Sequence, residues 1–121
     1  MTNYEKCEVI FYVFRCKSAI VNNCYVGHTT NFLRRRREHK SRCSNELDKK
    51  YNFKLYKVIR DNGGWDNWNM IELHKQFCKD KRECERLEQQ LIDEYNSDMN
   101  VRKSFLHDSE KLYNELNEIL E

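Results

Sequence analysis

Residues 25–39 join the end of a short apolar strand to a helix with four consecutive arginines. The strand closes at Gly27, and a Thr/Asn turn leads into the helix. An earlier run, residues 8–15, is rich in β-branched and aromatic side chains and predicts another strand. The residues between the two runs, 17–23, suit a polar turn. The chain is therefore expected to begin as an antiparallel hairpin followed by a basic helix.

The rest of the chain alternates between helical and strand patterns. Gly63 and Gly64 mark the end of one helix, and Asp80 with Glu83 forms a capping box that opens another. The helices are expected at about 31–42, 45–61, 81–96 and 107–120, and a third strand at 68–73. This β-β-α-α-β-α order predicts an α/β fold, a small three-stranded antiparallel sheet flanked by helices, with an extra C-terminal helix. We assign residues 1–104 to one domain and 105–121 to an acidic helix that packs on it or extends it.

Composition narrows the class of protein. At 121 residues a single domain is expected, and the apolar runs are too short for a membrane span. The N-terminus is too polar for a secretory signal, so we expect an intracellular protein with reduced thiols. The six cysteines form no CxxC pair, and their separations match no usual zinc-ligand spacing. A zinc site that combines some of them with His28 or His74 is therefore the less favoured alternative.

Charge is distributed unevenly along the chain. Residues 1–60 carry 14 Lys/Arg and 5 Asp/Glu, whereas residues 61–121 carry 8 and 15. A basic half suggests a face for an anionic polymer such as a nucleic acid. The alternative is that the folded domain mixes both halves in space.

Glu88 is the most unusual polar residue of the helix at 81–96. It falls within a stripe of apolar residues, where a carboxylate is costly unless it is paired or coordinated. It could form a buried salt bridge, reach out from the rim, bind a metal or act in catalysis.

The basic helix and the hairpin offer further candidates. Arg35 and His39 are four residues apart and share one helix face. Tyr12 and Tyr25 could share one face of the hairpin, either as packed aromatics or as functional groups. The remaining basic residues are expected to contact phosphates or to face solvent, and they are Arg34, Arg36, Arg37, Lys40 and Arg42.

Together these positions resemble the GIY-YIG nuclease family. The matching segments, in chain order, are Phe11-Tyr12-Val13, Tyr25-Val26-Gly27, Arg35 ten residues after Tyr25, His39 four residues later, Glu88 in Glu88-Gln89-Gln90-Leu91-Ile92, and Asn100. The resemblance covers residues 8–102 and is strongest to short, stand-alone viral versions. The chain departs from the pattern in the first motif, which lacks its glycine, and at Leu91, where a Trp is usual.

The resemblance implies a metal-dependent DNA endonuclease. Glu88 would hold one Mg²⁺ or Mn²⁺ ion, Arg35 the scissile phosphate, and Asn100 would support the site. Tyr12, with Tyr25 or His39, would act as or orient the general base. DNA is the expected partner, with a homodimer as one way to gain specificity, and neither a membrane nor a small-molecule cofactor is expected.

Two other functions compete with this interpretation. A non-catalytic nucleic-acid-binding domain would use the basic residues at 34–42, but it gives no reason for Glu88. A protein-interaction module would use the acidic terminal helix.

Overall fold

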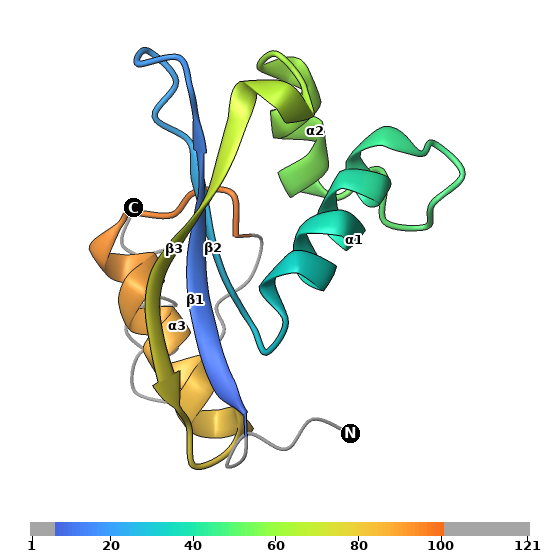
Figure 1. Ribbon diagram of the computed structural model, residues 1–121. Helices are drawn as coiled ribbons and strands as arrows, with labels where there is room; N and C mark the ends of the chain where they lie inside the picture. Colours follow the sequence, from blue (N-terminus) through green and yellow to red (C-terminus); the bar gives the residue numbers. More distant parts are fainter. Residues whose placement is uncertain (1–6, 101–121) are drawn as a thin grey trace, which may run out of the picture.

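The computed structural model describes residues 7–100, which form one three-stranded sheet with helices on both faces (Figure 1). The elements follow the predicted order, with a short 3₁₀ turn added before the last strand. They are β1 (Glu8–Cys16), β2 (Cys24–Thr29), α1 (Phe32–Ser44), α2 (Lys54–Asp61), η1 (Trp65–Asn67), β3 (Trp68–Phe77) and α3 (Lys81–Glu94). The predicted fold class is confirmed. The helix expected at 107–120 and the domain boundary at 104 lie outside the described residues.

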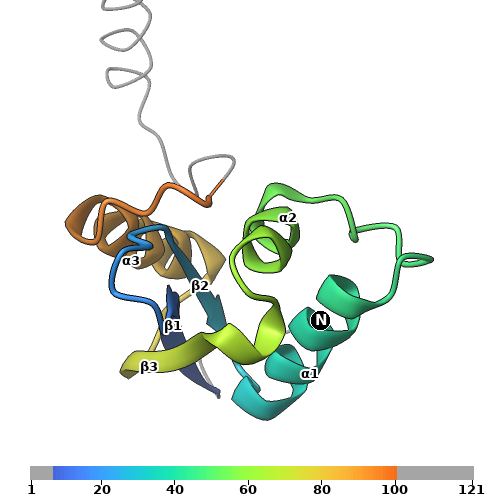
Figure 2. The same cartoon turned by 90° about the horizontal axis from the view of Figure 1, so that it is seen from above.

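The sheet has the order β2-β1-β3, and both pairings are antiparallel. Helix α3 covers one face, and α1 and α2 lie on the other (Figures 1 and 2). Because side chains alternate along a strand, β1 turns Val9, Phe11 and Val13 toward α3 and Tyr12 and Phe14 toward the other helices. All five side chains are buried, so β1 is the centre of two packed layers.

Helix α1 starts where the Thr/Asn turn predicts. Asn31 is its N-cap, and the side-chain oxygen of Asn31 accepts a hydrogen bond from the Arg34 backbone N–H at 3.1 Å. Phe32 packs edge-on against the Tyr12 ring, with ring centroids 6.2 Å apart, and attaches the first turn to the sheet. His39 and Cys43 are the buried residues of the helix.

The second helix is shorter than predicted. The predicted range was 45–61, but the helix begins at Lys54, and residues 45–53 form turns. The side chains of Asn45 and Asp48 accept hydrogen bonds from backbone N–H groups two residues ahead, at 3.1 and 2.8 Å, which competes with helix formation. Leu47 lies within these turns and is 88% exposed, although a helix over 45–61 would place it on the apolar face.

Strand β3 and helix α3 differ from the prediction only at their ends. β3 continues to Phe77, beyond the expected end at residue 73. Asp80 caps α3, accepting a hydrogen bond from the Glu83 N–H at 2.9 Å. None of the helices between residues 7 and 100 is long and apolar enough to span a membrane.

The cysteines are distributed through the fold as free thiols. Cys24, Cys43, Cys78 and Cys84 are buried, Cys16 is half-buried and Cys7 is exposed. Within residues 7–100, no cluster of three or more His, Cys, Asp or Glu side chains is suited to a metal ion.

Gly27 provides a close contact on which the position of Tyr12 depends. The two residues are opposite each other in the β1–β2 ladder, and a Cβ at residue 27 would lie 2.5 Å from the Tyr12 hydroxyl oxygen. Real Cβ atoms do not approach this closely, so glycine is required if Tyr12 is to remain in place.

We predict that Gly27→Ala lowers the free energy of unfolding by about 1–3 kcal/mol, because the added methyl group overpacks the site. Urea denaturation would measure the change. In a Tyr12→Leu background, which removes the hydroxyl, the same substitution should cost less. Equal costs in both backgrounds would contradict this explanation.

Candidate active site

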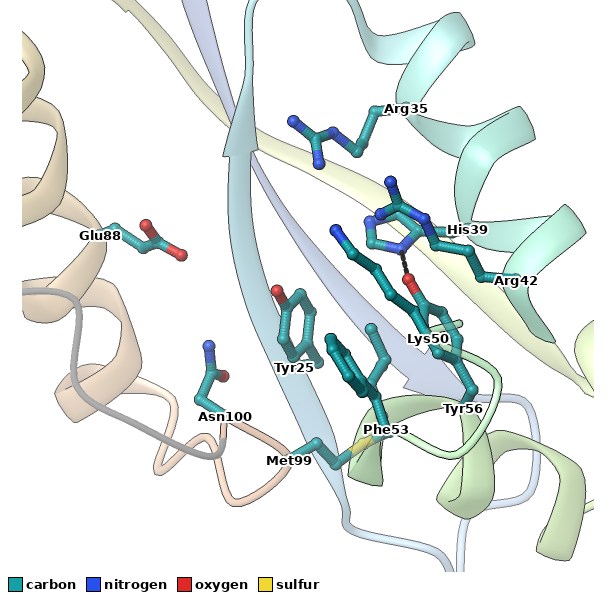
Figure 3. Close-up of a pocket in the computed structure, with 11 residues that line it drawn as sticks. Tyr25, Arg35, His39, Arg42, Lys50, Phe53, Tyr56, Glu88, Met99 and Asn100 are labelled. Atoms are coloured by element: carbon teal, nitrogen blue, oxygen red, sulfur yellow. Dashed lines mark hydrogen bonds between the residues drawn. The ribbon is translucent and has the colours of Figure 1, made fainter. Parts of the chain in front are cut away.

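A pocket of about 310 Å³ lies where β2, α1, α2 and the last described residues meet (Figure 3). Five of the six predicted catalytic residues line it, and so does Arg42, although they come from distant parts of the chain. The full lining is Tyr25, Arg35, His39, Arg42, Lys50, Phe53, Leu55, Tyr56, Glu88, Met99 and Asn100. Tyr12 is the one predicted catalytic residue outside this lining, and its hydroxyl is a hydrogen-bond partner of His39, which lines the pocket.

Tyr12, His39 and Tyr56 form a continuous hydrogen-bonded row. The Tyr12 hydroxyl lies 2.8 Å from Nε2 of His39, and Nδ1 of the same ring lies 2.8 Å from the Tyr56 hydroxyl. The relative exposure of these residues is 2, 3 and 2%, respectively. Both nitrogens of the imidazole are therefore engaged, and its orientation is held from two sides.

Burial keeps this row uncharged. Desolvation, together with the neighbouring Tyr25, raises the pKa of Tyr12 well above its usual value, although Arg35 opposes the shift. Desolvation lowers the pKa of His39 to about 3, and Arg35, Arg42 and Lys50 add to this effect. His39 is thus a neutral imidazole at physiological pH, and Tyr12 a protonated phenol.

Tyr25 stands at the pocket wall on β2. It pairs with Phe14 across the hairpin, which places it on the same sheet face as Tyr12, as the alternation predicts. Desolvation, with Glu88 and Tyr56 nearby, raises the pKa of Tyr25 well above its usual value. A protonated Tyr25 can donate a hydrogen bond into the pocket.

Glu88 reaches the pocket from α3, on the opposite side of β2 from α1 (Figure 3). The residue is 7% exposed, and one carboxylate oxygen lies 2.6 Å from Nδ1 of His28. The hydrogen-bond partner of Glu88 is thus a histidine on β2.

The donor set suits a hard divalent cation held mainly by water. Glu88 offers a carboxylate at the pocket, the group that Mg²⁺ prefers. Mg²⁺ commonly binds through one or two carboxylates and keeps several waters, so a single carboxylate beside an open pocket is sufficient.

Asn100 supports β2 from its outer edge. Its side-chain oxygen accepts a hydrogen bond from the Val26 N–H at 3.1 Å, and its amide donates to the Val26 carbonyl at 2.9 Å. Ser97 and Met99 add hydrogen bonds to the Cys24 carbonyl. The side chain of Asn100 thus takes the place of a neighbouring strand beside Tyr25.

The basic residues of α1 separate into two groups. Arg35 and Arg42 are half-buried and line the pocket, whereas Arg34, Arg36, Arg37 and Lys40 are exposed. Arg34 pairs with Glu38 at 3.2 Å, and the guanidinium of Arg36 lies 5.7 Å from the centre of the Trp65 ring. A second, polar hollow of about 450 Å³ at the start of α1 shares Arg35 and Arg42 with the pocket.

Sequence reasoning missed several pocket residues. Lys50 and Phe53 belong to the segment that was predicted as helix, so they gave no signal of a site. Tyr56 follows Leu55 on the buried face of α2, and a tyrosine at such a position is readily interpreted as a packing residue. The sequence suggests His28 as a possible zinc ligand, whereas the structure places it against Glu88.

The model of the GIY-YIG catalytic domain family matches residues 8–102, which include every element described above. The chain belongs to the GIY-YIG family. Members of this family are nucleases that generally use divalent metal ions. Neither a curated protein nor a solved structure matches the chain significantly. The GIY-YIG match and the geometry of the pocket therefore carry the functional argument together.

The state of His39 can be tested by the pH dependence of stability. Its pKa is about 3 in the folded protein against 6.5 in the unfolded chain, so between these values the unfolded chain binds the extra proton. Its contribution to stability is complete above pH 6.5 and declines by up to about 1.4 kcal/mol per pH unit as the pH falls. Urea unfolding of wild type and His39→Gln should show a shallower slope for the variant. Equal slopes would contradict the assignment.

Proposed function

We propose that this protein is a DNA endonuclease that hydrolyses phosphodiester bonds with the help of one divalent metal ion. One observation carries the proposal. A single pocket gathers Arg35, His39, Tyr25 and Glu88 from three separate elements, although 63 positions separate the first and last of them in the chain. Such a hydrolysis requires positive charge at the phosphate, an activated water and help for the leaving 3′-oxygen.

Arg35 is assigned to the scissile phosphate. It lines both the pocket and the hollow at the start of α1, so it can meet the backbone of a strand that crosses from one to the other. A guanidinium presents paired donors that match phosphate oxygens. Arg42 lies seven residues, about two turns, further along α1 and adds positive charge to the same pocket.

Glu88 is assigned to the metal, Mg²⁺ or Mn²⁺, with water completing the coordination. When bound, the ion would supply positive charge that stabilises the leaving oxygen. The hydrogen bond from His28 orients the carboxylate, as second partners commonly do for metal ligands.

The Tyr12–His39 pair is assigned to the activation of water, with Tyr25 beside it. His39 has no free ring nitrogen, because tyrosine hydroxyls lie at both, so a proton from water would enter at a phenol oxygen. The neutral state of the imidazole leaves Nε2 able to accept the Tyr12 proton in turn.

Replacement of Glu88 should separate cleavage from binding. We predict that Glu88→Gln lowers the rate of Mg²⁺-dependent plasmid nicking by at least about 10²-fold, because the metal ligand contributes several kcal/mol to the transition state. Glu85→Gln, on the same helix and paired with Lys81, is the matched control and should nick normally.

A Glu88→Gln protein that nicks at the wild-type rate would overturn the metal assignment. Wild-type protein that binds DNA but never nicks it, with or without Mg²⁺, would instead favour a non-catalytic binding domain.

Substitutions in the two groups of arginines should impair different steps, cleavage in one group and DNA binding in the other. Arg35→Ala is expected to lower the single-turnover cleavage rate by about 10²–10³-fold, because it removes a donor to the reacting phosphate. Arg37→Ala changes an exposed neighbour and should chiefly weaken DNA binding and its salt dependence. Cleavage at saturating protein, with affinity measured separately, distinguishes the two effects. Identical behaviour of both variants would contradict the division of the helix into two faces.

A further inference from the structure

We propose that Tyr56 is the outlet of a three-residue proton relay, Tyr12–His39–Tyr56, that carries the proton of the attacking water away from the reaction. The inference rests on the proposed function and adds to it a positioning and proton-transfer role for a residue on α2. Its geometric basis is the row of two 2.8 Å contacts through the His39 ring.

The resting direction of the hydrogen bonds follows from burial. We assign Tyr12 as the donor to Nε2, because its hydroxyl is buried outside the pocket lining and His39 offers its proton an acceptor, whereas Tyr56 itself lines the pocket. A neutral imidazole carries one N–H, which must then be at Nδ1 and donate to the Tyr56 oxygen. The hydroxyl proton of Tyr56 is left free to point toward water in the pocket, which this residue lines.

The same surroundings forbid an imidazolium intermediate. Burial and three nearby cations disfavour a positive charge on His39. A proton that arrives at Nε2 must therefore be matched by one that leaves Nδ1, and within residues 7–100 Tyr56 is the hydrogen-bond partner at Nδ1 that can receive it. The titratable groups that face this ring come from every neighbouring element, and they are Tyr12, Tyr25, Arg35, Arg42, Lys50 and Tyr56.

The transfer balances without a charged side chain. The attacking water gives a proton to the Tyr12 oxygen as its remaining O–H bonds to phosphorus. Tyr12 passes its own proton to Nε2, and Nδ1 passes its proton to the Tyr56 oxygen. Tyr56 releases its original proton to water in the pocket. All three residues end neutral, with the His39 tautomer and the hydrogen-bond directions reversed.

Arg42 assists the last transfer. Burial raises the pKa of Tyr56, and the Arg42 guanidinium opposes this by donating a hydrogen bond to its hydroxyl oxygen. Positive charge at this oxygen makes release of the proton easier. The alternative role for Tyr56 is purely structural, a cap on Nδ1 that orients His39.

The experiment compares Tyr56→Phe with Tyr51→Phe in single-turnover plasmid nicking at saturating protein and Mg²⁺. Tyr51 lies in the turn before α2, where its ring packs on Arg60, away from His39. We expect Tyr56→Phe to lose about 10²-fold in rate with little change in DNA affinity, and Tyr51→Phe to lose little. For the wild-type protein, a plot of the cleavage rate against the fraction of D₂O in the solvent should be curved, because several protons move in the same step. The plot for Tyr56→Phe should be closer to a straight line, because fewer protons move together.

A second variant covers the case in which Tyr56→Phe folds poorly. Tyr56→3-fluorotyrosine keeps the hydroxyl but lowers the pKa of the phenol, so the relay requires recovery of the rate together with a pH–rate profile shifted to lower pH. Nitrogen-15 NMR of the imidazole should show the proton on Nδ1 in the wild-type protein, and a proton on Nε2 would contradict the resting direction assigned above.

Four results would overturn the relay while leaving the endonuclease intact. These are wild-type cleavage by Tyr56→Phe, equal losses in the two Phe variants, an unchanged deuterium curve, or a recovered rate with an unshifted pH profile. A wild-type protein that never nicks DNA would instead overturn the proposed function, and the relay with it.

Discussion

The hydrogen bond between Tyr12 and His39 is the contact on which the rest of the site depends. It joins the central strand of the sheet to the basic helix, so it fixes how α1 lies across β1. Gly27 makes room for the phenol on one side, and Phe32 packs against its ring on another. Once the phenol is held, Arg35, four residues before His39 on the helix, faces the pocket and the adjoining hollow at the start of α1.

Strand β2 is the boundary between the two chemical halves of the pocket. Arginine and histidine approach from α1 on one side, and the Glu88 carboxylate approaches from α3 on the other (Figure 3). This separation lets positive and negative groups face a common space without pairing directly. A phosphate and a metal ion have opposite charges, and this arrangement offers the phosphate the cationic side chains and the metal ion the carboxylate. Each group also has a local partner. Arg35 and Arg42 lie 3.9 and 3.5 Å from Glu38. Glu88 lies 2.6 Å from His28.

Much of this arrangement could be predicted from the chain. Strand alternation placed Tyr12 and Tyr25 on one face, helical spacing paired Arg35 with His39, and the apolar stripe drew attention to Glu88. These are periodic signals, which survive in any local window of sequence. The turns at 45–53 could not be predicted in the same way, because a few side-chain oxygens that compete for backbone N–H groups overrode an apolar pattern that fits a helix. Lys50 and Phe53 lie in these turns and could not be predicted as pocket residues for that reason. Tyr56 lies on the buried face of α2, where its position predicts packing and gives no sign of a polar function.

The amide of Asn100 has a further consequence for how the domain assembles. A strand at the edge of a sheet offers its backbone to any other chain, and β2 would be such a strand. The Asn100 side chain occupies both backbone groups of Val26, and residues 97 and 99 engage Cys24. Asn100, which the resemblance assigns to the active site, therefore also protects the edge of β2 from pairing with a strand of another molecule. Loss of this side chain should promote aggregation, independently of any effect on cleavage.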